Sequence, residues 1–428
     1  MQSAQRSSAM RLLVRLMDGL AAVGLLRPAL DPDRLVARAR RRTGLEDLGE
    51  GFDETGLRLL LEGCQEDAHL HALGALAARQ DVLTMLCNRL RMVDERRRWP
   101  EIAEQRIQAP LFITGLPRSG TTFLHRLLAQ DPQHRSPAAW ELLYPSPPPR
   151  IETATTDRRI AKARRSIGWL HLLAPAFRHI HEVGPTLPEE CIAAMGHCFV
   201  SERFPAMYRI PRYERWFDAL LLDAAYADHR RMLQHLQWRH PAPHWLLKAP
   251  AHLFGLDAIF NTYPDAHIIQ THRDPARSLA SWASFVTTLH GAFSHRVDPM
   301  EIGNNVSARW QHALERALQA RAQRPGGGFI DVHYDALVAD PMGTVRAIYR
   351  QLERPLSAEA EAAMQHFLRD ESKEQAGRHH YAAGDFGLDP ARERQRFAFY
   401  IHRFGVSEEP VPQRSRIGAV GTGRRRAA

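Results

Sequence analysis

The sequence predicts an α/β fold in which helices flank a parallel sheet, with a helical N-terminal region before it. Three observations lead to this prediction. Four short apolar segments that end in polar residues alternate with helical patterns between residues 110 and 337. The first apolar segment runs directly into a glycine-bounded loop and a helix. Before residue 105 the patterns are helical throughout. Buried strands that alternate with helices are typical of a parallel sheet.

The composition is that of a globular protein in a reducing compartment. The chain has 428 residues, of which 44% are hydrophobic and 25% charged, and a chain this long usually holds more than one structural unit. None of its four cysteines stands in C-x-x-C spacing, so we expect no disulfide framework and a cytoplasmic location.

The net charge of +9 does not by itself indicate a nucleic-acid partner. The 57 basic residues are spread along the chain among 48 acidic ones and do not form one basic arm. All but three of them are arginines; the only lysines are Lys162, Lys248 and Lys373. We therefore expect an anionic ligand and no nucleic acid.

The run "MRLLVRLMDGLAAVGLL", residues 10–26, predicts an amphipathic helix that docks on the protein. Arg15 and Asp18 interrupt it, and it is shorter than the ~20 apolar residues of a membrane-spanning helix. No later segment is apolar and long enough to span a bilayer. A superficial contact with a membrane is the alternative that this pattern leaves open.

Further helices complete the N-terminal region, which we place at residues 1–105. In "DPDRLVARARRRTGL", Asp31 is a helix cap, Pro32 occupies the first turn, and Gly44 follows the last residue. The next long segment, residues 57–93, repeats apolar residues at helical spacing. We find no candidate chemistry in this region.

The strands are expected within "LFITG", "HWLLKAP", "AHIIQTHRDP" and "GGFIDVHYDAL". Ligands of parallel sheets bind at the carboxyl ends of the strands. Three of these ends carry polar residues, at 115–118, 248–252 and 271–273. The predicted site therefore lies at this edge of the sheet. Residues 150–245, rich in Arg, His and Trp, predict a helical cap over it, and residues 406–428 a disordered basic tail.

The loop "GLPRSGTT" predicts a P-loop-like anion site. Gly115 and Gly120 have P-loop spacing, but Thr121 stands where the loop lysine is expected, and Arg118 is the cation inside the loop. Backbone N–H groups at the start of the following helix attract anions. Without the lysine, a terminal phosphate that carries a good leaving group suits the loop better than a triphosphate with Mg²⁺.

A second anion subsite is predicted after the strand in "HIIQTHRDPARSLASWASF". Asp274 caps the next helix and Pro275 suits its first position. Arg273 stands just before that helix, and Ser281 lies about two turns into it. The pair could hold one phosphate between the strand end and the helix face.

Together these segments resemble the 5′-phosphosulfate loop and the 3′-phosphate motif of sulfotransferases that use 3′-phosphoadenosine 5′-phosphosulfate (PAPS). The matching stretches are "GLPRSGTTFLHRLL" and "RDPARSLAS", in that order. "HRDP" and "GDFGL" are similar to the bacterial branch of this family. The resemblance covers about residues 110–404, so we expect a sulfotransferase-like α/β domain at 106–405.

The resemblance also implies which residues bind PAPS. Arg273 and Ser281 are expected to hold the 3′-phosphate, and Phe123 to lie near the adenine. The 5′-phosphosulfate is expected to contact the loop and the first helical turn at Arg118, Ser119, Gly120, Thr121 and Thr122. No metal ion is required.

Lys248 and His252 are candidate catalytic residues. A lysine at the end of a buried strand can stabilise the charge that develops on the bridging oxygen as sulfate leaves. A neutral imidazole four residues later can accept the proton of the acceptor hydroxyl. The segment resembles the Lys/His segment of cytosolic sulfotransferases, although here two more residues separate the lysine from the histidine.

Two glutamates compete with His252 for the role of base. Glu141 follows the helix of the phosphate loop, where protein-tyrosine sulfotransferases carry a similarly placed glutamate. In "LPEEC", Glu189 and Glu190 point in different directions on a helix, so we expect one of them, Glu190, to reach the site. All three candidates remain open.

The predicted reaction is in-line transfer of a sulfuryl group from PAPS to a hydroxyl or amine of an unknown acceptor. Small-molecule, lipid and glycan acceptors remain open, and so does the oligomeric state. One alternative is a P-loop nucleotide kinase or NTPase, which needs a loop lysine and an acidic metal ligand. Another is a non-enzymatic nucleotide- or nucleic-acid-binding protein, which predicts salt-dependent binding and indifference to loss of Lys248.

Overall fold

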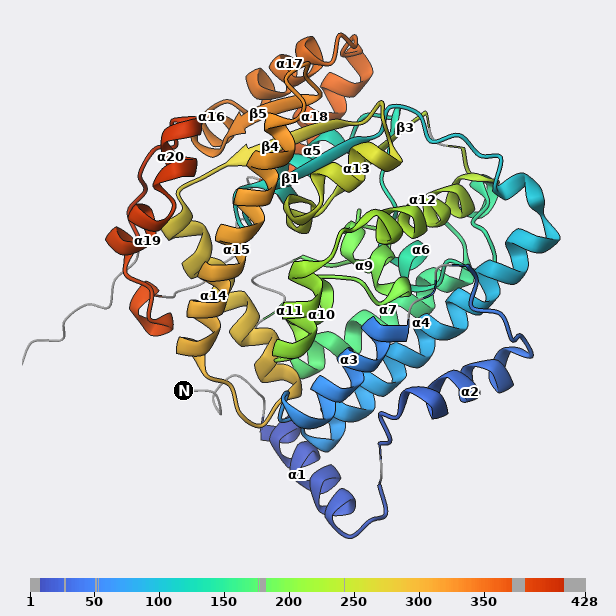
Figure 1. Ribbon diagram of the computed structural model, residues 1–428. Helices are drawn as coiled ribbons and strands as arrows, with labels where there is room; N and C mark the ends of the chain where they lie inside the picture. Colours follow the sequence, from blue (N-terminus) through green and yellow to red (C-terminus); the bar gives the residue numbers. More distant parts are fainter. Residues whose placement is uncertain are drawn as a thin grey trace, which may run out of the picture.

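A five-stranded parallel sheet organises the upper half of the protein as drawn in Figure 1. This computed structural model describes residues 8–26, 28–50, 52, 54–175, 177, 182–241, 243–371 and 382–411. The strands are β1 Leu111–Gly115, β2 His134–Arg135, β3 His244–Lys248, β4 His267–His272 and β5 Phe329–His333, in the order β2-β3-β1-β4-β5. All neighbours are parallel, so the predicted α/β class and all four predicted strands are confirmed.

The two faces of the sheet are covered by different sets of side chains. Successive residues of a strand point to opposite faces. Leu111 and Ile113 of β1 belong to the smaller apolar cluster, with side chains of α5, α17 and α18. Phe112 points the other way, into the larger cluster. Burial on both faces explains why β1 is an almost continuously apolar segment in the sequence.

The helices occupy the flanks of the sheet and the lower half of the molecule (Figure 1). In chain order they are α1 Ser8–Ala22, α2 Pro32–Thr43, α3 Glu54–Glu66, α4 Ala72–Arg98, α5 Thr121–Leu128, α6 Ala139–Leu143, α7 Arg158–Leu173, α9 Cys191–Met195, α10 Arg203–Met207, α11 Pro211–Ala219, α12 Asp223–Gln237, α13 Leu256–Thr262, α14 Pro275–Phe293, α15 Pro299–Ala322, α16 Tyr334–Ala339, α17 Pro341–Gln351, α18 Ala358–Glu371, α19 Pro390–Arg396 and α20 Ala398–Phe404. Short 3₁₀ turns are η2 Pro100–Ile102, η3 Ile151–Thr153, η4 Gly196–Cys198, η5 Pro250–Phe254 and η6 Ala383–Phe386.

Two helices begin at the caps that the sequence predicts. The Asp31 carboxylate accepts a hydrogen bond from the N–H of Arg34 at 2.7 Å, and α2 ends at Gly44, whose φ is 69°. Asp274 caps α14 through the N–H of Ala276 at 3.0 Å. A capping carboxylate satisfies N–H groups that the first turn cannot pair internally.

The N-terminal helices share one hydrophobic core with the rest of the protein. Leu57 of α3 and Leu86 of α4 belong to the same buried cluster as Phe204, Tyr226 and Phe112. In Figure 1, α9–α12 lie between the sheet and α1–α4. The boundary at residue 105 and the role of residues 150–245 as a cap therefore stay predictions.

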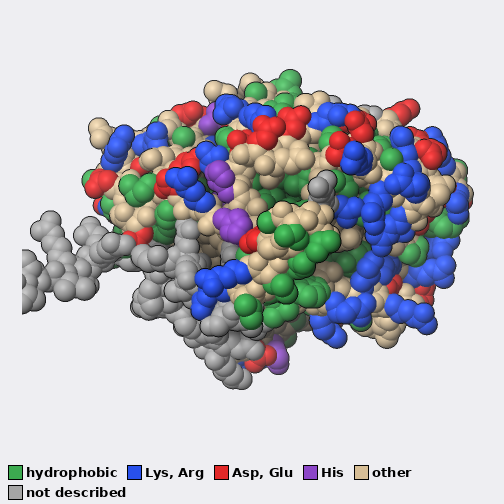
Figure 2. Space-filling model, turned by 90° about the horizontal axis from the view of Figure 1, so that it is seen from below, with side chains coloured by type: hydrophobic (Ala, Val, Ile, Leu, Met, Phe, Trp, Pro, Cys, Tyr) green, Lys and Arg blue, Asp and Glu red, His purple; other side chains and the backbone are tan. Residues whose placement is uncertain are grey.

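The surface seen from below carries apolar and basic side chains next to each other (Figure 2). α1 and α2 lie at this end of the molecule in Figure 1. Across the described residues, no helix has the length and apolar character needed to cross a membrane. The predicted disordered tail falls largely on residues 412–428, which lie outside the described residues.

Candidate functional site

The loop after β1 depends on a close approach between β1 and β4. The φ of Gly115 is 143°, and a Cβ at this residue would lie 2.3 Å from Oγ1 of Thr271 and 2.4 Å from its carbonyl oxygen. No side chain fits in that space. Gly120, with a φ of 92°, ends the loop at the N-cap of α5. Glycine is required at both turns because other residues are strained at positive φ.

The side chain of Ser119 links the loop to Thr271 of β4. Its buried hydroxyl donates to the carbonyl oxygen of Leu116 at 2.5 Å and lies 2.6 Å from Oγ1 of Thr271. Its N–H also bonds to Leu116, at 3.2 Å. The ligand contact expected for Ser119 stays a prediction, and in this structure its hydroxyl holds the loop.

The start of α5 presents N–H groups to the loop. The first four N–H groups of a helix have no acceptor within the helix, and the helix dipole makes this end attractive to anions. At α5 these groups belong to the first turn, beginning with Thr121 and Thr122. Arg118, whose φ is 66°, stands before this turn. The arrangement can bind a phosphate or sulfate group.

The two predicted anion motifs meet. Nε of Arg118 donates to the hydroxyl of Ser281 on α14 at 3.2 Å. Nη1 of Arg273, at the end of β4, donates to the carbonyl oxygen of Arg118 at 2.6 Å. Residues more than 150 positions apart in the chain therefore form one cationic surface at the carboxyl edge of the sheet.

Arg273 has a second partner, which the sequence does not indicate. Its guanidinium forms a bidentate ion pair with the carboxylate of Glu409, with Nε–Oε1 at 2.7 Å and Nη2–Oε2 at 2.8 Å, and lies 3.7 Å from the ring centroid of Tyr334. The N–H of Glu409 donates to Asp274 at 2.8 Å, and Arg394 donates to the Glu409 carbonyl oxygen at 2.6 Å. The C-terminal segment is thus anchored beside the second anion motif.

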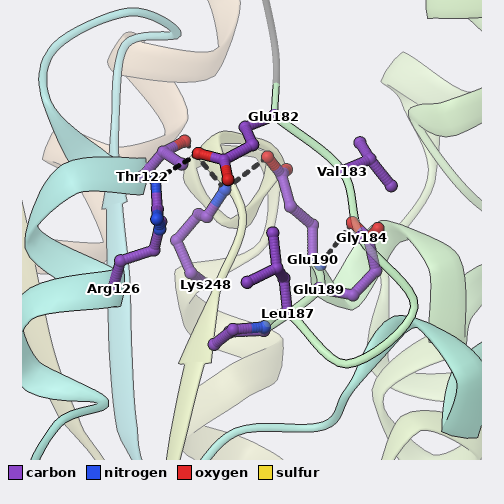
Figure 3. A pocket seen from close by; sticks show the side chains of 10 residues that line it. Thr122, Arg126, Glu182, Val183, Gly184, Leu187, Glu189, Glu190 and Lys248 are labelled. Atoms are coloured by element: carbon purple, nitrogen blue, oxygen red, sulfur yellow. Dashed lines mark hydrogen bonds and ion pairs between the residues drawn. The ribbon is translucent and has the colours of Figure 1, made fainter. Parts of the chain in front are cut away.

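Lys248 connects the loop helix α5 with the segment that precedes α9 (Figure 3). Its buried Nζ donates to the hydroxyl of Thr122 at 3.2 Å and forms a close ion pair with the carboxylate of Glu190. Thr122 lies in α5, Lys248 is the last residue of β3, and Glu190 occupies the N-cap position of α9. Of the three candidate bases, Glu190 is the one that contacts Lys248.

These three residues line a small pocket in Figure 3. Arg126 of α5 and Glu182, which pair at 2.5 Å, form another part of its wall. The remaining lining residues are Val183, Gly184, Leu187, Pro188 and Glu189. Sequence reasoning missed Arg126 although it follows Thr122 by one helical turn, whereas no sequence signal indicates Glu182.

Glu189 supports Glu190 from the neighbouring position. Its Oε1 accepts the N–H of Glu190 at 2.8 Å. Burial raises the pKa of the Glu189 carboxyl above its usual range. Both residues precede α9 and both line the pocket, so the expectation that only one of them reaches it from a helix is not met. They differ in their partners, because Glu190 pairs with Lys248 while Glu189 bonds to the backbone.

His252 follows β3, in η5, and is not among the residues that line the pocket. Its fully buried ring contacts Phe112, with the centroids 5.0 Å apart, and its Nδ1 lies 2.6 Å from the hydroxyl of Tyr226. Burial, followed by electrostatic interaction with His229 and Lys248, lowers the pKa of His252 well below its usual value. The imidazole is neutral, and its buried Nε2 has no hydrogen-bond partner among the described residues.

Glu141 forms a buried structural ion pair. Its carboxylate binds Arg135 at 2.7 Å and accepts the N–H of Ala138 at 2.9 Å. Burial alone would raise its pKa, but Arg135, His240 and the Ala138 N–H together outweigh burial and lower it. Glu141 is not among the residues that line the pocket of Lys248.

Phe123 lies on α5, on the side that meets α18. Its ring centroid is 6.5 Å from that of Phe367, and it packs against the smaller apolar cluster. The side chain is partly exposed. Its expected position near an adenine stays a prediction.

Side chains that commonly bind metals are dispersed. Among the residues that the structure describes, no three His, Cys, Asp or Glu side chains gather in a way that could hold a metal ion. All four cysteines are buried and free. The metal independence expected from the sequence stays a prediction.

Comparison with known proteins identifies similar chains. A model described as "Sulfotransferase family" matches residues 110–358. Sulfotransferase STF1 from Mycobacterium tuberculosis H37Rv is 34% identical, with a TM-score of 0.77 over 86% of this chain and 98% of that one. Sulfotransferase STF9 from Mycobacterium avium is 26% identical, with a TM-score of 0.78 over 89% and 98%.

A curated relative has a named acceptor. Omega-hydroxy-beta-dihydromenaquinone-9 sulfotransferase Stf3 of Mycobacterium tuberculosis is 24% identical over 258 residues, which is 57% of this chain. The match spans 62% of the length of that relative.

Proposed function

Because the chain belongs to the sulfotransferase family, we propose that it transfers a sulfuryl group from PAPS to a hydroxyl or amine of an acceptor. The observation that carries this proposal is the contact between Arg118, Arg273 and Ser281. PAPS has two separate anionic groups, a 5′-phosphosulfate and a 3′-phosphate. A helix N-terminus beside Arg118, joined to a second cation at Arg273, suits such a ligand.

The polar groups at the sheet edge fit both anionic ends of PAPS. We assign the 5′-phosphosulfate to Arg118 and to the first turn of α5 at Gly120, Thr121 and Thr122. We assign the 3′-phosphate to Arg273 and Ser281. Arg273 already holds a carboxylate through two parallel hydrogen bonds, and guanidinium groups bind phosphate in the same bidentate manner. Glu409 must release Arg273 before a phosphate binds there.

The proposed chemistry follows from the contacts of Lys248. In the transfer, the acceptor oxygen forms a bond to sulfur as the bond between sulfur and the bridging phosphate oxygen breaks. Lys248 stabilises the negative charge on that leaving oxygen, and its hydrogen bond to Thr122 keeps it beside the phosphate loop. Glu190 accepts the proton of the acceptor hydroxyl. Positioning and electrostatic stabilisation supply most of the catalysis.

Glu190 is the base that the geometry favours. A base must lie within hydrogen-bonding reach of the acceptor proton. Glu190 lines the pocket beside Lys248, whereas both carboxylate oxygens of Glu141 are engaged by Arg135 and Ala138. His252 is fully buried and is not among the residues that line the pocket.

We further propose that the acceptor is a hydroxylated, apolar molecule of lipid character. The curated relative is named for a menaquinone derivative that bears an omega-hydroxyl group. The pocket is also lined by Val183, Leu187 and Pro188, which can contact an apolar acceptor. The four free cysteines are compatible with a cytoplasmic location, which we include in the proposal.

Calorimetry with 3′,5′-adenosine bisphosphate and with ATP·Mg²⁺ tests the nucleotide assignment. We expect the bisphosphate to bind without metal and to bind more tightly than ATP·Mg²⁺. A preference for ATP·Mg²⁺, or loss of bisphosphate binding in a chelator, would support a P-loop kinase or NTPase instead.

Transfer itself is tested with ³⁵S-labelled PAPS and a panel of hydroxylated quinones, sterols and sugars. Label should appear in an extractable lipid product and should require Lys248. Labelling of sugars alone would refute the lipid acceptor while leaving the sulfotransferase activity intact.

A further inference from the structure

α1 has an apolar face that nothing in the described structure covers. Met10 and Val14 of this helix are buried against the protein. Leu12 and Leu16 lie about 200° around the helix from them and are 69% and 59% exposed. In an ordinary surface helix, polar side chains occupy that outer face.

The turn after α1 extends this apolar face. Val23 and Leu25 are 70% and 77% exposed. Both are held by backbone hydrogen bonds, since the N–H of Val23 bonds to Gly19 at 3.2 Å and that of Leu25 to Leu20 at 3.0 Å. Four large apolar side chains, those of Leu12, Leu16, Val23 and Leu25, therefore project from one ordered helix–turn unit, which we term the apolar ridge.

α2 presents a basic face beside the apolar ridge. Leu35, Val36 and Ala39 point into the core, and the exposed positions at helical spacing carry Arg34, Arg38, Arg41 and Arg42. The carboxylates near α2 pair with arginines other than these four, as Glu46 does with Arg40 at 3.3 Å. Within the described ranges, the four exposed arginines form no ion pair.

Neighbouring helices add further positive charge. Lys162 and Arg165 on α7 are exposed, and Arg91 on α4 is partly exposed. Burial, and then the charges of Arg91, Arg42 and Arg165, lower the pKa of Lys162, so these side chains are close enough to repel one another. Such an accumulation of like charge is costly unless an anionic partner neutralises it.

We propose that the apolar ridge and the basic face of α2 together dock the protein on an anionic lipid bilayer. Figure 2 shows the apolar patch and the basic band side by side on one face of the molecule, at the end where Figure 1 places α1 and α2. Leucine and valine side chains can enter the acyl boundary while arginines bind lipid phosphates.

The combination of the two surfaces selects this partner over others. A nucleic acid would use the arginines but leave the leucines exposed to water. A second copy of the chain could cover the leucines, but a symmetric contact would bring two arginine-rich faces together. An anionic bilayer satisfies both surfaces at once. This proposal does not depend on the identity of the enzyme's acceptor.

Vesicle sedimentation of the full chain tests the proposal. We expect binding to vesicles of phosphatidylglycerol and phosphatidylcholine, weaker binding at high salt, and little binding to phosphatidylcholine alone. The variant L12E/L16E and the variant R38E/R41E/R42E should each lower the partition coefficient on the order of tenfold or more.

Matched controls distinguish docking through these two surfaces from non-specific binding to vesicles. Val338→Glu places a charge on an exposed apolar residue of α16, and R350E/R392E/R403E reverses three exposed arginines of α17, α19 and α20. Both controls should bind vesicles as the unmodified protein does. The melting temperature of each variant shows whether a loss of binding is caused by unfolding or by the loss of contacts with the vesicle.

Three outcomes would overturn the proposal. The first is equal binding to neutral and anionic vesicles, and the second is equal loss of binding in the control variants. The third is a concentration-dependent dimer in analytical ultracentrifugation that L12E/L16E abolishes, with no vesicle binding, because the apolar ridge would then contact a second copy.

Discussion

The carboxylate of Glu409 occupies the guanidinium of Arg273 through two hydrogen bonds, of 2.7 and 2.8 Å. These are the donors that we assign to the 3′-phosphate of PAPS. A carboxylate and a phosphate cannot use both donors at the same time. On this assignment, the C-terminal segment competes with the nucleotide for Arg273.

Replacing Glu409 with Gln should strengthen nucleotide binding. The neutral amide is a weaker competitor for Arg273 than the carboxylate, so the affinity for 3′,5′-adenosine bisphosphate should rise about tenfold. Calorimetry measures this change directly. Glu408→Gln is the matched control, because Glu408 is exposed and pairs with Arg394 at 3.1 Å instead. A weaker affinity in Glu409→Gln would mean that Glu409 positions Arg273 for the nucleotide.

Glu190→Gln should slow turnover without weakening nucleotide binding. Loss of the general base is expected to lower kcat by about 10²- to 10⁴-fold. Steady-state kinetics and bisphosphate calorimetry separate the two effects, and Glu152→Gln, an exposed glutamate of the predicted cap, is the control. If His252→Gln or Glu141→Gln stopped turnover while Glu190→Gln did not, the base would have to be reassigned.

Lys248→Met should lower kcat by about 10²- to 10³-fold, because the leaving oxygen loses its cationic partner. The affinity for the bisphosphate product should change much less. Lys162→Met, which removes an exposed lysine from α7, should leave kcat unaltered. Since Lys248→Met leaves Glu190 without its ion-pair partner, the double variant K248M/E190Q distinguishes lost catalysis from lost stability. Undiminished turnover in Lys248→Met would exclude the proposed role.

Glu141→Gln should destabilise the protein in a pH-dependent way. The pKa of Glu141 is lower in the folded chain than in the unfolded one, so its stabilisation is present above the unfolded pKa of about 4.3. That stabilisation is lost as the pH falls through the folded pKa.

At pH 7 the loss of the Glu141–Arg135 pair should cost about 3–5 kcal/mol of unfolding free energy. The difference in melting temperature between Glu141→Gln and the unmodified protein should shrink as the pH falls below about 4. Glu46→Gln breaks an exposed pair and should change stability by less than about 1 kcal/mol. A difference that is independent of pH would contradict the lowered pKa.

The four predicted strands were predictable because most of their residues are buried; among them only Asp331 of β5 is exposed. The segments that begin at Leu111, His244, His267 and Phe329 are short apolar runs, and all four form strands. The family resemblance, carried by two motifs, is also confirmed. β2 was missed, since it has two residues and exists only through its pairing with His244 and Trp245. No periodicity can be detected over two residues.

The meeting of Arg118 with Arg273 and Ser281 followed from topology. The carboxyl ends of neighbouring parallel strands must lie at one edge, and β1 and β4 are neighbours. The contacts of Glu190 and Glu409 depend instead on how distant segments fold back over that edge. Glu190 lies 58 residues from Lys248 and Glu409 lies 136 from Arg273, so local sequence patterns hold no information about either contact.

The close contact between Gly115 and Thr271 leaves no room for a side chain at Gly115. Any Cβ there would meet Thr271 at 2.3–2.4 Å, whatever the rest of the side chain. In a saturation mutagenesis library, Gly115 should tolerate no substitution, because even alanine would push β1 away from β4. The ends of β1 and β4 at this loop are therefore coupled, and a change in one requires a matching change in the other.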